Sequence, residues 1–222
     1  MSGSALYEYD RAGFPMLWLE ELGAFVHWLP VTKIQCEHFL CDVTDSSFDA
    51  PWYDQLLALN PRVSPKEIDE RNYWRAIVTG VQPTEAERFA RWCGEGYSLP
   101  TLRQWCDAYA ACKEVPAQDI VWPDSLPARV RTLLARTDLA WRKAAARMGT
   151  PQTRADQMLM RLGAMEWVED VADGYRWGGM GRLHPDFHGL LFTPDHGRSA
   201  RPTRPEIDRL SYYGFRLLRR PQ

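Results

Sequence analysis

Residues 97 to 110 have the sequence YSLPTLRQWCDAYA, which predicts a short extended segment followed at once by a helix. Thr101 and Gln104 are spaced as in a capping box, in which a threonine oxygen and a glutamine side chain satisfy free amides of the first helical turn. Trp105 and Tyr109 then recur at helical spacing, so one face of this helix is apolar. The same type of helix start recurs elsewhere in the chain and guides the assignment of the fold class.

Two earlier helices are marked in the same way. Residues 32 to 35 (TKIQ) and 84 to 87 (TEAE) both fit capping boxes. A fourth helix is predicted over residues 126 to 148, where apolar residues follow a helical period and Pro127 suits the first turn. Strands are predicted at residues 16–20, 24–28, 74–81, 165–168, 175–177 and 213–218, and residues 43–72 are predicted to form a surface connection. Helices first and a loop-rich β region last favour an α+β fold over a repeating βαβ sheet.

The composition predicts one domain spanning residues 1–222, because 45% hydrophobic residues in 222 are enough for one full core. The formal net charge of -2 gives no reason to expect nucleic acid as a partner. The N-terminus lacks the pattern of a signal peptide, and no run approaches the roughly 20 apolar residues of a membrane span. We therefore expect a cytoplasmic protein without a membrane span. Five cysteines without a C-x-x-C pair favour buried, reduced thiols.

Six segments, in order, resemble motifs of the formylglycine-generating (sulfatase-modifying factor) enzyme family. The strongest is YSLPT with Trp105 and Tyr109, which resembles the family's RLPTEAEWEYA. The other five are 30–40, similar to PVTNxQYxxFL; 78–92, similar to VSWxDAxAFxxWL; 165–167, similar to the end of GNVWEW; 177–179, at the place of RGGSW; and 214–219, similar to GFRLVR. The resemblance implies a single, irregular C-type-lectin-like domain with short strands, about four helices and long loops. The helix within residues 124–150 departs from the family pattern and is interpreted as an insertion.

The resemblance also bears on catalysis. Members that oxidise a substrate cysteine carry a copper-binding cysteine pair between the R-G-G element and the closing G-F-R strand, whereas Cys112 is the last cysteine of this chain. We therefore expect a non-catalytic member with no cofactor. Of the family's structural calcium site, only Glu166 is matched, so calcium is left open and no metal ligand is assigned.

The long loop before the last strand, residues 176–213, is the ligand surface that the resemblance implies. It mixes apolar aromatic rings with charged side chains, and Trp and Arg are the types that dominate interface hot spots. The candidate ligand-binding residues are Trp177, Arg182, His184, Asp186, His188, Asp195, His196 and Arg198. The alternative is a metal-dependent oxidoreductase, either a diverged oxidase or a non-haem iron enzyme that uses the histidines of this segment with Asp186. A solvated loop without function is the third interpretation.

The predicted helix over residues 126–148 has a strongly basic polar face. Arg129, Arg136 and Arg147 are candidate partner-binding residues. Such a basic helix could dock an acidic partner, a membrane surface or nucleic acid, and of these we favour a protein or peptide partner. A solvated face is the alternative, since arginine stems also cover apolar surface. These features together favour a non-catalytic binding module for a protein, a peptide or a small ligand. Such a module could be a sensor or accessory subunit of a bacterial signalling or conflict system, or a variable protein diversified by a retroelement.

Overall fold

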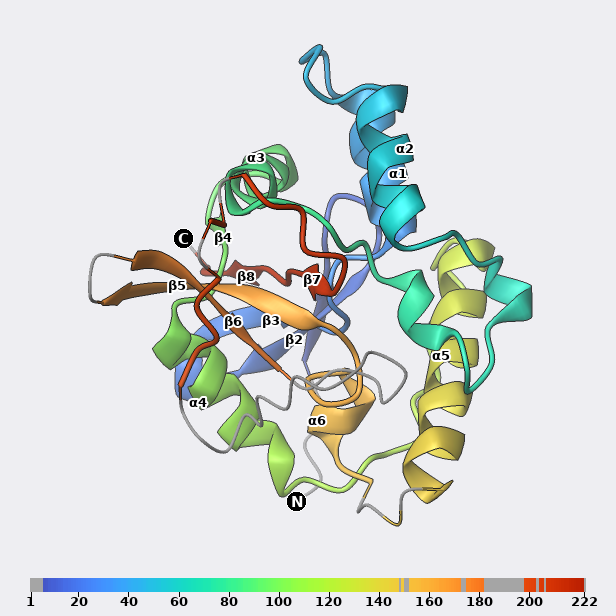
Figure 1. The fold of residues 1–222 in the computed structure, drawn as a ribbon. Coiled ribbons are helices and arrows are strands. Elements are labelled where there is room, and N and C mark those ends of the chain that lie inside the picture. Colours follow the sequence, from blue (N-terminus) through green and yellow to red (C-terminus); the bar gives the residue numbers. More distant parts are fainter. Residues whose placement is uncertain are drawn as a thin grey trace.

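The fold of the chain is given by a computed structural model, which combines two β-sheets with α-helices around them (Figure 1). It describes residues 6–147, 149, 152–172, 175–181, 198–202, 204–205 and 207–221. The strands are β1 (Tyr7–Tyr9), β2 (Pro15–Leu19), β3 (Ala24–His27), β4 (Tyr97–Ser98), β5 (Met165–Ala172), β6 (Tyr175–Met180), β7 (Tyr213–Gly214) and β8 (Leu218–Arg219). The α-helices are α1 (Lys33–Asp42), α2 (Ala50–Leu59), α3 (Pro83–Cys93), α4 (Leu102–Lys113), α5 (Ala128–Arg147) and α6 (Arg154–Gln157). The architecture is therefore α+β, as the sequence predicted.

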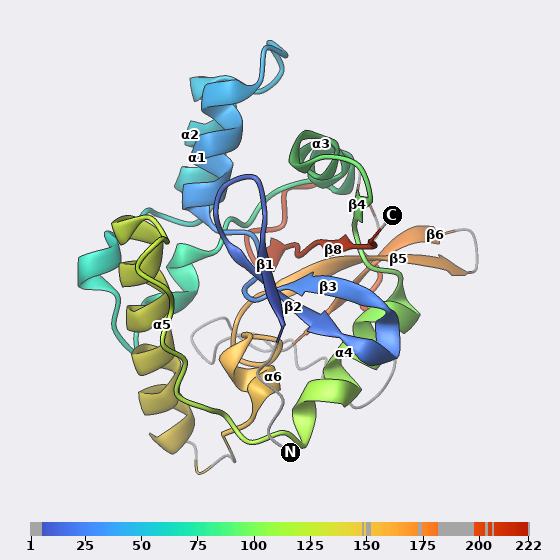
Figure 2. The same cartoon turned by 180° about the vertical axis from the view of Figure 1, so that it is seen from behind.

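The larger sheet has the strand order β1-β2-β3-β8-β4, with antiparallel neighbours throughout. β2 and β3 form the hairpin expected from the two apolar runs, and Gly23 takes the left-handed conformation (φ 56°) that its turn requires. β8 lies between β3 and β4, with Val26 opposite Leu218. The last strand of the chain is thus enclosed by strands from its first half, as Figure 2 shows from behind.

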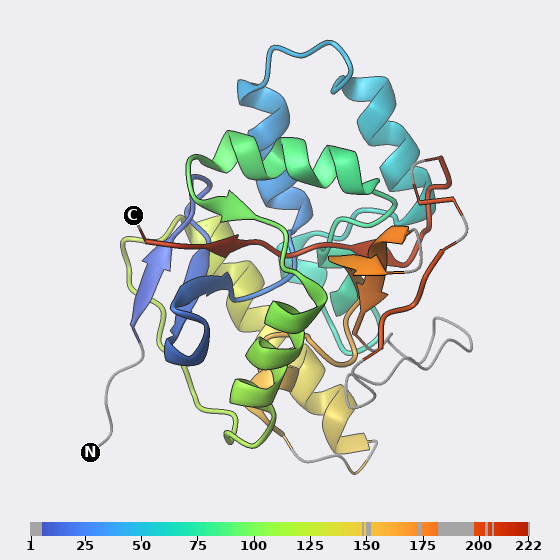
Figure 3. The same ribbon diagram turned by 90° about the vertical axis from the view of Figure 1, so that its left-hand side faces the viewer.

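The smaller sheet has the order β6-β5-β7, and β7 is parallel to β5. Gly179 of β6 faces the ring of Tyr213, and a Cβ atom there would lie 2.4 Å from that ring. Only glycine fits this close approach. Figure 3 shows the C-terminal segment crossing the molecule from β7 to β8, so residues 213–219 belong to both sheets.

The helix starts agree in part with the prediction. The capping boxes of α1 (Thr32 with Gln35) and α4 (Thr101 with Gln104) are both present. The predicted box at residues 84–87 is wrong: α3 begins at Pro83, and its box joins Gln82 to Glu85. Proline suits the first helical position because its missing N–H would have no partner there, which moves the helix start two residues upstream.

Three further predictions need correction. The predicted surface connection at 43–72 contains α2, which begins at Ala50 and is capped by Asp49, whose carboxylate accepts from the Trp52 amide (2.8 Å). The predicted strand at 74–81 begins instead as a 3-10 helix, Tyr73–Ala76, followed by a single bridge between Thr32 and Ile77. Among the described residues there are six α-helices rather than about four, because α2 and the short α6 were not expected. The helix predicted over residues 126–148 is confirmed as α5.

A buried ion pair lies where the two sheets meet. Arg216 bonds the Glu166 carboxylate through Nε (2.7 Å) and Nη2 (2.8 Å). It also donates to the carbonyl oxygens of His27 (2.8 Å) and Met158 (2.7 Å), and the Trp105 indole donates to Glu166 (3.0 Å). The pair therefore links β3, β5, α4 and the end of α6.

No helix among the described residues has both the length and the apolar character that crossing a membrane requires.

Candidate functional site

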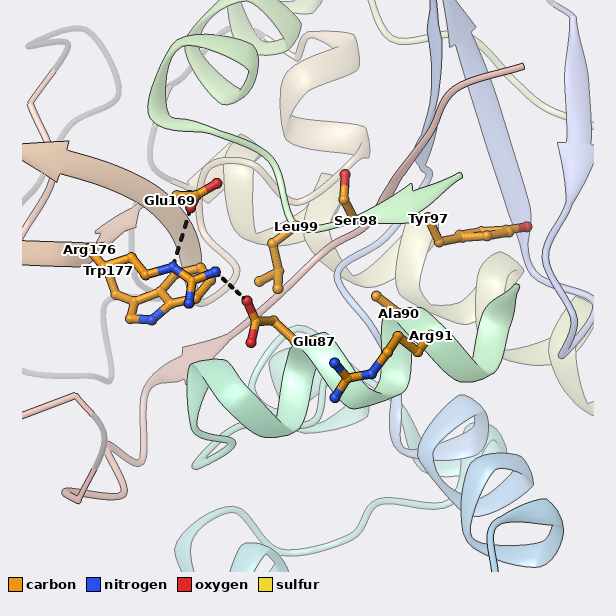
Figure 4. A pocket seen from close by; sticks show the side chains of 9 residues that line it. All are labelled: Glu87, Ala90, Arg91, Tyr97, Ser98, Leu99, Glu169, Arg176 and Trp177. Carbon is orange, nitrogen blue, oxygen red and sulfur yellow. Dashed lines mark hydrogen bonds and ion pairs between the residues drawn. The ribbon is translucent and has the colours of Figure 1, made fainter. Parts of the chain in front are cut away.

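A depression of about 520 Å³ lies between α3, β4 and the β5–β6 hairpin (Figure 4). Its lining residues are Glu87, Ala90, Arg91, Tyr97, Ser98, Leu99, Glu169, Arg176 and Trp177. Ala90, Leu99 and Trp177 are buried and form an apolar floor, while charged side chains stand around it. The volume falls in the range of roughly 300–1,000 Å³ that is usual for ligand pockets.

Regular structure places each of these side chains. Glu87 and Arg91 are four residues apart on α3, so both project from one face of the helix. Arg176 and Trp177 are consecutive on β6, and Arg176 is exposed while Trp177 is buried. Glu169 lies opposite Trp177 on β5. The depression is thus built from two distant parts of the chain, residues 87–99 and residues 169–177.

Arg176 is held over the floor by two carboxylates. Its Nη2 atom lies 2.7 Å from Glu87 and its Nε atom 3.3 Å from Glu169, as the dashed lines in Figure 4 show. Its guanidinium carbon also lies 4.7 Å from the centre of the Trp177 ring, a cation–π distance. The guanidinium is therefore fixed before any ligand arrives.

Arg91 differs from Arg176. It is exposed, and no carboxylate among the described residues lies within ion-pair distance of it. It stands between the depression and a second hollow of about 460 Å³ lined by Phe39, Phe48 and Trp92. Its charge is thus available to a ligand that reaches from one hollow to the other.

The chemistry of the depression suits binding by ion pairing and hydrogen bonding. Burial raises the pKa of the Tyr97 hydroxyl well above its usual range, so the hydroxyl keeps its proton and can donate a hydrogen bond. Ser98 is exposed beside it and can both donate and accept. Figure 4 shows the Tyr97 hydroxyl directed away from Arg176 and Trp177, so among the described residues a ligand would find the exposed Arg91 cation and the Ser98 hydroxyl above a largely buried apolar floor.

Two of the predicted ligand-binding residues are described. Trp177 belongs to the floor of the depression with only 2% of its surface exposed, so it is not the exposed anchor that we expected. Arg198 is exposed, next to residues 199–201, which lie against the β5–β6 hairpin: Ala200 pairs with Gly179, and Arg201 lies 3.3 Å from Asp170. The other six, Arg182, His184, Asp186, His188, Asp195 and His196, lie outside the described residues.

The arginines of α5 are not part of the depression, and Figures 1 and 2 show this helix on the side away from the β5–β6 hairpin. Arg129 pairs with Glu37 (3.1 Å) and Arg147 with Glu70 (2.6 Å), so both attach α5 to the rest of the fold. Arg136 is exposed and has no ion-pair partner among the described residues. Of the three predicted partner-binding residues, only Arg136 is unpaired within the described part of the chain.

The possible metal ligands among the described residues do not come together in one place. Both oxygens of Glu166, the residue that the resemblance relates to calcium, are bonded to Arg216. Within the described ranges, no three His, Cys, Asp or Glu side chains are grouped so as to hold a metal ion. All five cysteines are free, with Cys36, Cys93 and Cys112 buried. The histidines of the oxidoreductase alternative fall in the part of the chain left undescribed.

Glu87, Arg91 and Glu169 were not predicted from the sequence. The i, i+4 spacing of Glu87 and Arg91 on a helix was the one available signal, and it does not say what the helix faces.

Comparisons of the chain with protein-family models, with curated proteins and with solved structures found no match.

Proposed function

We propose that the chain is a non-catalytic recognition module that binds a peptide segment of a protein partner in the depression between α3, β4 and the β5–β6 hairpin. The observation that carries the proposal is the apolar floor of Ala90, Leu99 and Trp177 beneath a rim of charged side chains. Apolar floors with charged rims are the usual anatomy of protein interfaces, and Trp and Arg dominate their binding energy.

The fixed position of Arg176 favours binding further. Two carboxylates and the Trp177 ring hold its guanidinium, so a ligand that packs against it orders little additional side chain. Ordering a mobile side chain on binding costs about 0.5–1.5 kcal/mol. The preorganised Arg176 therefore presents a fixed surface to the ligand. Arg91, which has no ion-pair partner in the described part of the chain, supplies the charge that selects an acidic residue in the ligand.

The resemblance to the formylglycine-generating enzyme family supports the same function. A C-type-lectin-like scaffold of that family would present the loop before its last strand to a ligand, and β6 begins this segment with Arg176 and Trp177. The missing cysteine pair supports a binding role rather than oxidation. A sensor or accessory subunit of a bacterial signalling or conflict system, or a retroelement-diversified binding protein, would use such a surface.

Selection from a displayed library of random peptides tests the proposal. Peptides recovered on the purified chain should share an acidic residue next to an apolar one, and their affinity can be measured by fluorescence anisotropy. Arg91→Glu should weaken the binding of a selected peptide at least tenfold, because it replaces the cation by a carboxylate that repels the acidic residue of the peptide.

Arg136→Glu is the matched control, since it makes the same charge change at an exposed arginine of α5 that lines no part of the depression. It should leave the affinity unchanged. If no peptide is enriched, or if both variants weaken binding equally, the depression is not the recognition surface.

A further inference from the structure

A smaller hollow lies apart from the depression, between α5 and the connection that precedes it. It has a volume of about 170 Å³, and its walls include Trp28 after β3, Asp119 and Trp122 of the α4–α5 connection, and Ala135 and Asp138 of α5. Figure 2 shows this connection running along α5. The volume is below the roughly 300 Å³ of pockets for whole small molecules, so the hollow suits one side-chain group.

Aromatic rings form one corner of the hollow. The rings of Trp28 and Trp122 meet edge to face, with centroids 5.6 Å apart and planes at 75°. Tyr7 packs against both, at 6.0 Å and 5.4 Å. The rings therefore support one another in fixed positions, and their faces carry the negative potential that attracts cations.

Two carboxylates complete the hollow and play different parts. Asp138 is fixed by Trp141 Nε1 (3.1 Å), Gln157 Nε2 (3.0 Å) and Arg142 Nε (2.9 Å), so it adds charge but has little capacity left for further hydrogen bonds. The side chain of Asp119 is 97% exposed and lies 3.4 Å from Arg142 Nη2. Two carboxylates against one guanidinium leave one negative charge, and Asp119 has oxygens free to accept hydrogen bonds.

We propose that this hollow binds the guanidinium group of an arginine side chain presented by a peptide or protein chain. A guanidinium is flat, weakly hydrated and permanently charged, so it can stack on an indole face while it donates two parallel hydrogen bonds to a carboxylate. Trp122 supplies the face and Asp119 the carboxylate. Arg142 makes the same combination within the chain, 5.3 Å from the Trp141 ring centre and paired with Asp138.

The neighbouring surface suits a chain-borne arginine. Val121, between Ile120 and Trp122, is 95% exposed and offers an apolar contact at the edge of the hollow. A free guanidinium would not use this contact, whereas the backbone of a bound peptide would cover it. This site shares no lining residue with the depression of the proposed function, so either can fail without the other.

The test uses N-acetyl-L-arginine methylamide as the probe and the citrulline analogue as its neutral isostere. The indole N–H signals of the ten tryptophans are followed by NMR, with the Trp122 signal identified from Trp122→Phe. The arginine probe should shift the Trp28 and Trp122 signals, and citrulline should bind at least tenfold more weakly because it carries no charge. Equal binding of the two probes would overturn the proposal.

Two variants on α5 show where the probe binds. Ala135→Leu fills the hollow from an exposed helix position and should abolish the shifts, whereas Ala146→Leu makes the same change at another exposed position outside the hollow and should preserve them. Asp119→Asn should weaken arginine binding at least threefold and leave citrulline unaffected. Normal binding to Ala135→Leu would overturn the proposal.

Discussion

Arg216 carries a charge into an interior where 1% of its side chain is exposed, and every bond that it makes there is to Glu166 or to a backbone carbonyl. Removing one partner of such a pair leaves an uncompensated buried charge, which costs about 3–5 kcal/mol. We therefore expect Arg216→Met to lower the free energy of unfolding by that amount, measured by urea denaturation.

The control for Arg216 is Arg88→Met. Arg88 pairs with Asp45 at the surface, where ion pairs contribute about 0–1 kcal/mol, so this change should alter stability by less than 1 kcal/mol. The double variant Arg216→Met with Glu166→Leu should recover part of the loss, because it removes both charges. If Arg216→Met is as stable as Arg88→Met, the interior is not held together by this pair.

Lys33, at the first position of α1, is buried and donates hydrogen bonds to the carbonyl oxygens of Pro61 (3.1 Å) and Arg75. Burial, assisted by Arg75 and Arg62, lowers the pKa of Lys33 from 10.5 to about 7. Between pH 7 and pH 10.5 the unfolded chain therefore holds a proton that the folded chain has released, and stability rises with pH in this window.

The pH dependence of stability measures this effect. From pH 7 to pH 9 the free energy of unfolding should rise by about 2 kcal/mol more in the natural chain than in Lys33→Met, since each pKa unit corresponds to about 1.4 kcal/mol. Lys66→Met changes an exposed lysine and should leave the slope as it is. If the free energy of unfolding depends on pH in the same way in the natural chain and in Lys33→Met, Lys33 keeps its usual pKa.

At the scale of the element, the start of α3 depends on Glu85 rather than on the predicted Thr84. The Glu85 carboxylate accepts from the Gln82 amide (2.8 Å), from the Trp52 indole (2.8 Å) and from two nitrogens of Arg209 (2.8 and 2.6 Å). A lost cap costs about 1 kcal/mol and a lost bond to a charged group about 1.5–3 kcal/mol. Glu85→Ala should therefore destabilise the chain by at least 2 kcal/mol in thermal or urea unfolding.

Thr84→Ala distinguishes the predicted helix start at Thr84 from the observed capping box of Gln82 with Glu85. Thr84 is exposed and lies inside α3, so its loss should change stability by less than 0.5 kcal/mol, the usual limit for surface substitutions. Were Thr84→Ala to cost more than Glu85→Ala, the capping box predicted from the sequence would be the correct one.

Local patterns predicted those elements whose ends are fixed by neighbouring residues. The caps of α1 and α4 and the β2–β3 hairpin are of this kind, because all their partners lie within a few residues. α2 has a local cap in Asp49, but its buried face also depends on distant residues, since Trp52 bonds Glu85, and the sequence pattern does not show this contact. The depression was missed for the same reason. Arg176 and Glu87 are 89 residues apart, and no local pattern brings them together.

At the scale of the whole molecule, residues 213–219 connect the two sheets. β7 pairs with β5 in the smaller sheet, β8 pairs with β3 and β4 in the larger one, and Arg216 between them bonds both sides. The buried apolar residues form two clusters, one of which contains residues of both sheets, such as Val26 of β3 and Val168 of β5, and the half-buried Trp92 packs against both clusters. A chain joined in this way should unfold as one cooperative unit rather than as two.

The native cysteines report on this directly. Cys112 lies in one apolar cluster and Cys36 and Cys93 in the other, while Cys41 is exposed. Burial raises the pKa of Cys112 to about 11 and those of Cys36 and Cys93 higher still, so in the folded chain these thiols react slowly at pH 8. In pulsed alkylation read by mass spectrometry, all three should become reactive at one urea midpoint, with Cys41 reactive throughout. A separate midpoint for Cys112 would mean that the two apolar clusters unfold independently and that the shared C-terminal segment does not couple them.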